Sequence, residues 1–340
     1  MPNLNAPALE GALYGGVIRE DVMEKIWDIS KIPLPFTDAC SKGTHTNRRV
    51  EFVVDKLGTP INSNAVVEGV DITQNNTAIG TRLGNYTQIP VKAVQITTTA
   101  EASNGIGGMN SLSYQLMMRQ QELRRDVEAQ MLSHQASVAG DAATIAGISA
   151  GIGAQLKTNV KVGATGTVGG FNTTTGLFVA PTPGTKRALS EAMIRDVLQD
   201  IYVAGGNTAM LMARPPVIRL MSTYMFGTTA KIATLQTVTS GAAAQTAIGS
   251  VNVFVTDFGQ VVKMVDNRIQ LVDTTATSSM YFLDPSHLKQ SFMRGYQTDP
   301  LGKTGLTDKR MMSCEYSMLV LNEISQGAIL AIDEALAMVA

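Results

Sequence analysis

The sequence predicts an α+β fold, and three observations support that prediction. Residues 48–136 read as a projecting two-stranded β-ribbon that leads into one long helix. Residues 143–279 mix helical and strand patterns, and residues 280–340 read as strands that return to the long helix. A chain of 340 residues exceeds the usual size of one hydrophobic core, so we expect about two packed modules.

The ribbon is predicted from two strand-like segments, Arg49–Leu57 and Gln88–Ile96. Apolar and polar residues alternate along the first segment, as in a strand with one covered face. The second segment changes phase between Ala93 and Val94, which predicts a β-bulge, and Pro90 favours a sheet edge. About thirty residues rich in Asn, Thr, Gly and Val separate the segments, too many for a tight turn. Because an isolated hairpin is only marginally stable in water, we expect the ribbon to bind a partner.

The long helix is predicted from Ser111 to Ser137, which gives a length of about 40 Å at 1.5 Å per residue. Two interpretations of its charged side stay open, a solvated face and a face that binds a neighbouring subunit. One narrow apolar stripe runs along the helix, formed by Leu112, Leu116, Leu123, Val127 and Met131. The charged side comprises Glu122, Arg124, Arg125, Asp126 and Glu128.

The middle of the chain predicts a compact α+β module. A helix is expected over residues 191–203, capped by Ser190, and a second one over residues 216–225. Short buried strands are expected at residues 210–213, 251–255 and 261–265. Further strands follow at residues 280–283 and 311–321. In the last of these, one face should cover the apolar stripe of the long helix, and it comprises Met312, Cys314, Tyr316, Met318 and Val320.

These elements predict five segments along the chain. The first is an N-terminal arm with one short helix near residues 20–28, in which Pro33 and Pro35 interrupt regular structure. The predicted boundaries are 1–43 for the arm, 44–104 for the ribbon, 105–142 for the long helix, 143–279 for the middle module and 280–340 for the returning strands.

Composition indicates a protein that buries much of its surface against other subunits. Charged residues make up 16% of the chain against roughly 25% in typical soluble domains, and the mean hydropathy is +0.08. An ordinary surface of Ser, Thr and Asn is the alternative interpretation. The net charge of −1, without any block of Lys or Arg, argues against strong sequence-independent binding of nucleic acid. Two cysteines, Cys40 and Cys314, fit a reducing compartment, and we expect no secretory signal or membrane span.

The search for catalytic and cofactor motifs predicts no enzyme, no cofactor and no metal site. The three histidines are far apart in sequence, and no Cys-x-x-Cys pair occurs. Gly302-Lys303-Thr304 resembles the end of a phosphate loop, but Gln297 replaces the first required glycine. No Gly-x-Ser-x-Gly elbow and no correctly spaced dinucleotide fingerprint are present.

The order of arm, ribbon, long helix, α+β module and returning strands resembles the major capsid proteins of tailed phages, which have the Hong Kong 97-type fold. In that family the parts are called N-arm, E-loop, spine helix, A domain and P domain. Local sequence also resembles one phage capsid subfamily. The matching segments are residues 81–89, 122–128, 135–137, 187–191, 256–259, 283–285 and 303–305.

The resemblance implies a shell protein that assembles with itself into pentamers and hexamers around double-stranded DNA, in the host cytoplasm and then in the virion capsid. It also implies a separate scaffolding protein and a portal protein, allows for a decoration or cement protein, and makes packaged DNA a non-specific content. An encapsulin-type nanocompartment and, less well supported, a tail or neck protein stay open as alternatives. We expect the ribbon of one subunit to lie over the long helix of the next, with charged contacts that involve Lys56, Glu68, Asp71, Arg82, Glu122, Arg124, Arg125, Asp126 and Glu128.

Overall fold

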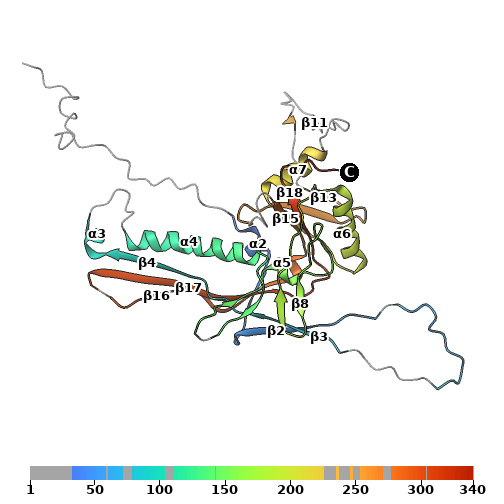
Figure 1. The fold of residues 1–340 in the computed structure, drawn as a ribbon, viewed down its shortest axis with the longest axis horizontal. Helices are drawn as coiled ribbons and strands as arrows, with labels where there is room; N and C mark the ends of the chain where they lie inside the picture. Colours follow the sequence, from blue (N-terminus) through green and yellow to red (C-terminus); the bar gives the residue numbers. More distant parts are fainter. Residues whose placement is uncertain are drawn as a thin grey trace, which may run out of the picture.

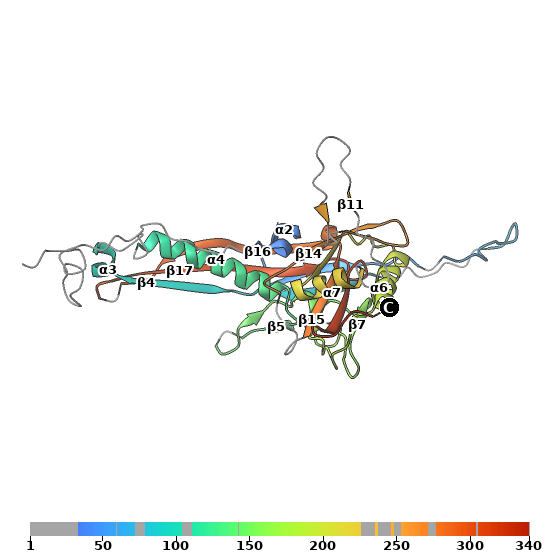
Figure 2. The ribbon, with the colours of Figure 1, turned by 90° about the horizontal axis from the view of Figure 1, so that it is seen from above.

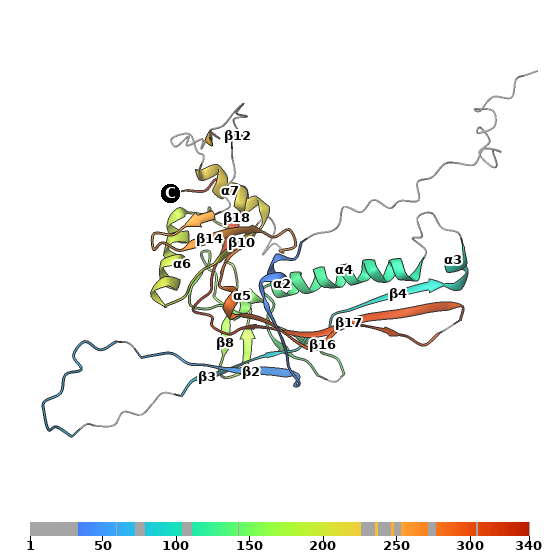
Figure 3. The ribbon, with the colours of Figure 1, turned by 180° about the vertical axis from the view of Figure 1, so that it is seen from behind.

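A long arm and a ribbon extend in opposite directions from a central unit (Figures 1 and 3). The computed structural model describes residues 33–58, 60–71, 79–103, 111–141, 143–225, 235–236, 246–247, 253–270, 277–303 and 305–339. The short helix and the first part of the arm predicted within residues 1–32 lie outside these described residues.

Helices and strands alternate along the described chain, so the α+β prediction is confirmed. The helices are α2 (Pro35–Ala39), α3 (Thr98–Ala102), α4 (Leu112–Met131), α5 (Ile152–Gln155), α6 (Glu191–Val203), α7 (Pro215–Met225) and the 3-10 turn η2 (Pro285–His287). The first nine strands are β1 (Ser41–Thr44), β2 (Arg49–Val54), β3 (Thr81–Tyr86), β4 (Val91–Thr97), β5 (Val138–Ala139), β6 (Gly147–Ile148), β7 (Val160–Lys161), β8 (Gly170–Asn172) and β9 (Leu177–Val179). The later strands are β10 (Met210–Ala213), β11 (Leu235–Gln236), β12 (Thr246–Ala247), β13 (Val253–Val255), β14 (Val261–Asp266), β15 (Thr277–Leu283), β16 (Leu288–Pro300), β17 (Thr307–Val320) and β18 (Gly327–Asp333).

The long arm consists of helix α4 lying along a four-stranded sheet with the order β1-β16-β17-β4 (Figures 1 and 2). The apolar face predicted for β17 is buried, and four of its five side chains share one core with Val127 and Met131 of α4. These four are Cys314, Tyr316, Met318 and Val320, and the fifth, Met312, is buried outside that core. β4 is an edge strand of this sheet, as Pro90 indicated. The long arm is therefore a helix packed on a sheet, with buried side chains between the two.

The central unit is a six-stranded mixed sheet with the order β13-β14-β10-β15-β18-β7. Helices α6 and α7 pack on one face through a core that includes Ile194, Val197 and Ile201. The other face contributes Met212 and Tyr281 to the core of the arm. This sheet therefore lies between the two helices and the arm, and it fixes the arm relative to the central unit.

The ribbon strands pair differently from the prediction. β2 pairs antiparallel with β3, with Phe52 opposite Leu83, whereas the segment predicted as its partner contains β4, which pairs with β17. The register between β4 and β17 runs without a shift from Val91 to Thr97, so the predicted bulge is wrong. Apolar residues lie on both faces of β4, and this imitates a change of phase.

The long helix ends earlier than predicted, and one predicted helix breaker is wrong. α4 begins after its cap Ser111 but ends at Met131, six residues before the predicted end, and Ser133 bonds back to the carbonyl of Gln130. Pro35 does not interrupt regular structure, because it occupies the first turn of α2, where a proline lacks no needed donor. The helix over residues 191–203 and its Ser190 cap are confirmed.

The predicted boundary at residue 280 separates strands that belong together. β15 and β18 lie in the six-stranded sheet of the central unit, while β16 and β17 run out into the arm. The predicted segment 44–104 also divides, because β2 and β3 form the ribbon and β4 belongs to the arm. The packed units of the subunit therefore do not correspond to continuous segments of the chain, because strands that are distant in sequence pair in the same sheet.

Candidate assembly surfaces

The ribbon carries large apolar side chains that the subunit leaves uncovered. Their exposed fractions range from 55% to 95%, although the rest of the described chain buries two extensive cores. Exposed apolar side chains gathered in one segment favour a site of protein interaction. The residues are Val53, Leu57, Ile61, Val66, Val67, Val70 and Ile79.

The loop between β2 and β3, residues 55–80, has a defined turn in its described part. The amide of Val70 donates to the carbonyl of Val67 at 3.2 Å, and Gly69 has a φ of 83°. A positive φ at the third position is typical of a type II β-turn, where glycine fits without strain. The turn places Glu68 at its corner between exposed valines. The end of the loop is thus both acidic and apolar.

The root of the ribbon, in contrast, is held by buried polar contacts. Asn85 of β3 is fully buried, and its amide nitrogen donates to the carbonyl of Met318 at 2.6 Å and to the hydroxyl of Ser149 at 3.1 Å. Its side-chain oxygen accepts from the amide of Ala150 at 2.9 Å. Because each of these groups would be costly to bury unpaired, the network fixes β3 against the end of β17.

Further contacts hold the root from both sides. Arg48 donates to the carbonyl of Gly140 and Arg49 to that of Gly176, each at 2.9 Å. Gln155 extends the Asn85 network, since it donates to Met318 at 3.1 Å and accepts from the amide of Val320 at 3.0 Å. The ribbon therefore leaves the subunit in one fixed direction.

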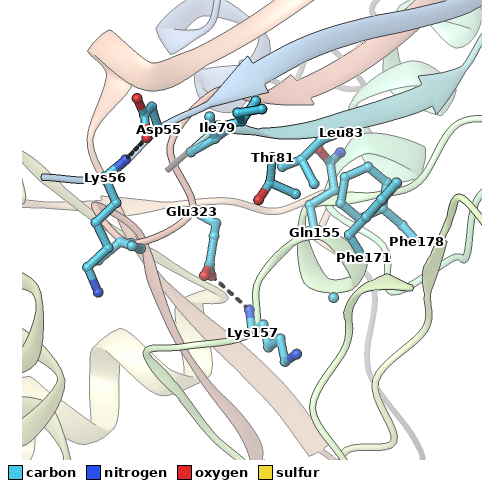
Figure 4. A pocket seen from close by; sticks show the side chains of 14 residues that line it. Asp55, Lys56, Ile79, Thr81, Leu83, Gln155, Lys157, Phe171, Phe178 and Glu323 are labelled. Atoms are coloured by element: carbon cyan, nitrogen blue, oxygen red, sulfur yellow. Dashed lines mark hydrogen bonds between the residues drawn. The ribbon is translucent and has the colours of Figure 1, made fainter. Parts of the chain in front are cut away.

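A cleft of about 360 Å³ lies between the ribbon root and the central unit (Figure 4). Leu83, Phe171 and Phe178 cluster at one end, and the two phenyl rings meet edge to face at 5.2 Å. At the other end, Glu323 accepts from the amides of Lys157 and Thr158, at 3.1 and 3.2 Å. The Glu323 carboxylate therefore holds residues 157–158 at this end of the cleft.

The four contact residues predicted for the ribbon differ in their surroundings within the subunit. Lys56, Glu68 and Asp71 are exposed, and within the described part of the chain none of them takes part in an ion pair. Arg82 differs, because it forms an ion pair with Glu51 across the two ribbon strands. It therefore contributes to the ribbon itself.

The charges of helix α4 divide into paired and unpaired ones. Asp126 pairs with Lys92 of β4 at 2.7 Å, and Glu122 pairs with Arg119 at 2.6 Å. The guanidinium of Arg124 lies over the ring of Tyr296 at 5.5 Å, and like Arg125 it has no acidic partner in the described residues. The helix thus presents uncompensated positive charge.

Glu128, also predicted as a contact to a neighbour, lies elsewhere. Its side chain is fully buried, and its carboxylate accepts hydrogen bonds from α2 and from Asn267. In this subunit it therefore serves an internal contact. Its position beside the apolar stripe was the available signal, because such a position faces partly inward.

Sequence reasoning singled out charges and missed the exposed aliphatic residues of the ribbon. The available signal was a set of valines and isoleucines within a loop otherwise rich in Asn, Thr and Gly. Among the described residues, no group of three His, Cys, Asp or Glu side chains is placed to hold a metal ion. No helix in that part of the chain is long and apolar enough to cross a membrane.

Known proteins resemble this chain over nearly its whole length. The family model described as SU10 major capsid protein matches residues 5–333. The major capsid protein of Escherichia phage Phieco32 is 24% identical over 332 residues, which cover 87% of this chain and 89% of that protein.

Solved structures share the fold at low sequence identity. The capsid of a native GTA particle matches with a TM-score of 0.60 and 12% identity, and the match covers 96% of this chain and 99% of that one. The SrpI encapsulin of Synechococcus elongatus PCC 7942 gives 0.57 and 10%, over 99% and 98% of the two chains. The capsid of cyanophage P-SCSP1u gives 0.56 and 11%, over 98% and 100%. The fold is the Hong Kong 97-type fold that the sequence resemblance implied.

The encapsulin match shows a shared fold, whereas the family model and the Phieco32 relative both specify a phage capsid. The chain therefore belongs to the SU10 major capsid protein family and is a phage major capsid protein that forms the capsid shell.

Proposed function

We propose that this capsid protein forms the pentamers and hexamers of an icosahedral shell that encloses double-stranded DNA of a tailed phage. The observation that carries the proposal is the ribbon, with a fixed root and an uncovered apolar loop. Laid over a neighbouring subunit, the loop would bury aliphatic side chains at ~25 cal/mol per Å² of apolar surface. Many modest contacts of this kind let a misplaced subunit leave during assembly, while their sum holds the closed shell.

The ribbon meets the spine helix α4 of the next subunit in this proposal. The loop carries Glu68 and Asp71 without ion pairs in the described chain, and α4 carries Arg124 and Arg125 without acidic partners there. Exposed ion pairs contribute only ~0–1 kcal/mol each. They would thus select the register of the contact, while apolar burial supplies most of its free energy.

The remaining partners follow from the same proposal. A separate scaffolding protein, a portal protein and a decoration protein would bind the shell, which would assemble in the host cytoplasm. The DNA would be a non-specific content, since the net charge of the chain is −1. The protein would have no catalytic activity, and the lack of a recognisable catalytic motif in the sequence supports this.

The test is to express the chain with and without candidate scaffolding proteins and to image the product by negative-stain electron microscopy. Closed shells tens of nanometres across, or free rings of five and six subunits, are the expected result. A monodisperse monomer or dimer under every condition would contradict it.

An encapsulin-type compartment is the second candidate, because the SrpI encapsulin shares the fold over 99% of this chain. The contents of purified shells separate the two. Nuclease-protected DNA from phage-infected cells supports the phage capsid, and one defined cargo protein would support the compartment.

A further inference from the structure

Glu128 of the spine helix is a buried carboxylate with four hydrogen-bond donors. One oxygen accepts from the amide of Phe36 at 2.9 Å and from the side-chain amide of Asn267 at 2.8 Å. The other oxygen accepts from the amide of Thr37 at 2.7 Å and from the Thr37 hydroxyl. These four donors are neutral, and they come from segments that are 91 and more residues away in sequence.

The carboxylate acts as the missing cap of helix α2. The residue before that helix, Leu34, makes no side-chain cap hydrogen bond, so the first amides of α2 need another acceptor. A negative charge at a helix N-terminus also interacts favourably with the helix dipole. Phe36 is fully buried in the same core as Val127 and Met131, so α2 is held on α4 by polar and apolar contacts together.

The contact joins three parts of the subunit at one point. α2 is the first described helix, and residues 1–32 precede it in the chain. α4 belongs to the long arm. Asn267 follows β14 of the central unit, and its side-chain oxygen accepts hydrogen bonds from the amides of Ile269 and Gln270. Figures 1 and 2 show α2 beside the end of α4 that meets the central unit.

A buried carboxylate stabilises a subunit poorly in comparison with an apolar side chain of similar size, because its desolvation is costly. Such a group is well suited to specify one geometry, since the α2 amides and Asn267 must meet it together. We propose that Glu128 is a positioning residue for assembly, which fixes helix α2, within the predicted N-terminal arm, at one place and in one direction on the folded subunit. The inference rests on the proposed function, because the role of Glu128 in assembly is read out as the formation of closed shells.

The test compares full-length wild type with Glu128→Gln and Thr37→Val. Glu128→Gln keeps the size of the side chain but places an NH₂ group against N–H donors, and Thr37→Val removes one of the four donors. Val197→Ala is the matched control, because it opens the α6 core and lowers the unfolding midpoint without a change near α2. Amide hydrogen exchange of the peptide 33–40 in unassembled subunits reports on α2, and electron microscopy reports on closed shells.

We expect roughly 10-fold faster exchange of peptide 33–40 in Glu128→Gln, a smaller increase in Thr37→Val, and a loss of closed shells in the same order. Val197→Ala should retain slow exchange in this peptide, and it should form shells at a temperature where its folded fraction equals that of Glu128→Gln. Unchanged exchange of peptide 33–40 in Glu128→Gln would show that Glu128 does not hold helix α2. Normal shells despite fast exchange would show that this contact has no role in assembly. Failure of the wild type to form shells would instead contradict the proposed function. The exchange measurement would still show whether Glu128 holds helix α2.

Discussion

The root and the loop of the ribbon differ in which kind of side chain they bury. At the root, Asn85 is completely buried and hydrogen-bonded to two segments of the subunit, residues 149–150 and Met318. In the loop, Val66 and Val67 are exposed, and the subunit offers them no cover. The polar side chain is therefore inside and the apolar ones are outside, the reverse of the usual arrangement.

This reversal distinguishes what the subunit needs alone from what the shell needs. The buried amide fixes a direction, because its hydrogen bonds are satisfied in only one placement of β3. The exposed valines gain free energy only after a second copy covers them. A subunit built in this way is rigid where it is mounted and incomplete where it meets its neighbour.

The largest effect is expected from the loop. Val66→Asp/Val67→Asp should abolish closed shells, because two charges would have to be desolvated in the contact. The free energy of unfolding of the unassembled subunit should change by less than ~0.5 kcal/mol, since both side chains are exposed there. Shell formation is measured by electron microscopy and unfolding by chemical denaturation.

Val66→Ile/Val67→Ile is the control for that pair, since it keeps the surface apolar and should assemble. Normal shells from the aspartate variant would mean that the loop is not buried on assembly. The contrast between root and loop would then have no bearing on the shell.

The root should respond in the opposite manner. Asn85→Leu leaves the amide of Ala150 without its acceptor and removes one of the two donors to the carbonyl of Met318, and we expect the subunit to lose about 3 kcal/mol of stability. Asn62→Leu, at an exposed position of the loop, should change stability by less than ~0.5 kcal/mol. Equal unfolding midpoints for the two variants would refute the buried network.

A weaker effect is expected from the charges of the spine helix. Arg124→Ala/Arg125→Ala removes two guanidinium groups without acidic partners in the described chain, and each proposed contact is worth only ~0–1 kcal/mol. We expect shells with a lower heat-resistance midpoint and a weaker dependence on salt, because screening acts on the lost pairs. Shells of normal size, heat resistance and salt response would show that these charges do not set the register.

The sequence predicts well those elements whose signals are local. Helix α6 carries its cap Ser190 and its core positions within thirteen residues, and the alternating face of β17 is continuous from Met312 to Val320. Each pattern needs no knowledge of the rest of the chain. The order of such elements then sufficed to indicate the fold.

Strand pairing and side-chain burial were harder to predict where the contacting residues are distant in sequence. β3 contains Gly84 and Asn85, which are poor strand residues, and its place is decided by contacts to residues 149–150 and 318. Glu128 looks like a surface charge in its helix, because its donors lie 91 and more positions away. The exposure of the ribbon valines is equally hard to predict from sequence, because it depends on how far the folded ribbon lies from the two cores.

The smallest effect concerns His45, which lies beside the ribbon root. Its ring nitrogens form hydrogen bonds with the hydroxyls of Ser291 and Thr87, at 2.9 and 3.0 Å. Desolvation lowers the pKa of His45, although the nearby Glu315 acts in the other direction. Below about pH 6.5 the unfolded chain therefore binds more protons than the folded one, so stability is complete above that pH and falls as the pH drops toward the lowered value. Since the ring is partly solvated, the loss should stay under ~1 kcal/mol. His45→Gln should weaken the pH dependence of the unfolding midpoint between pH 7 and 5. An unchanged pH dependence would show that the His45 ring is open to water, unlike the buried side-chain amide of Asn85.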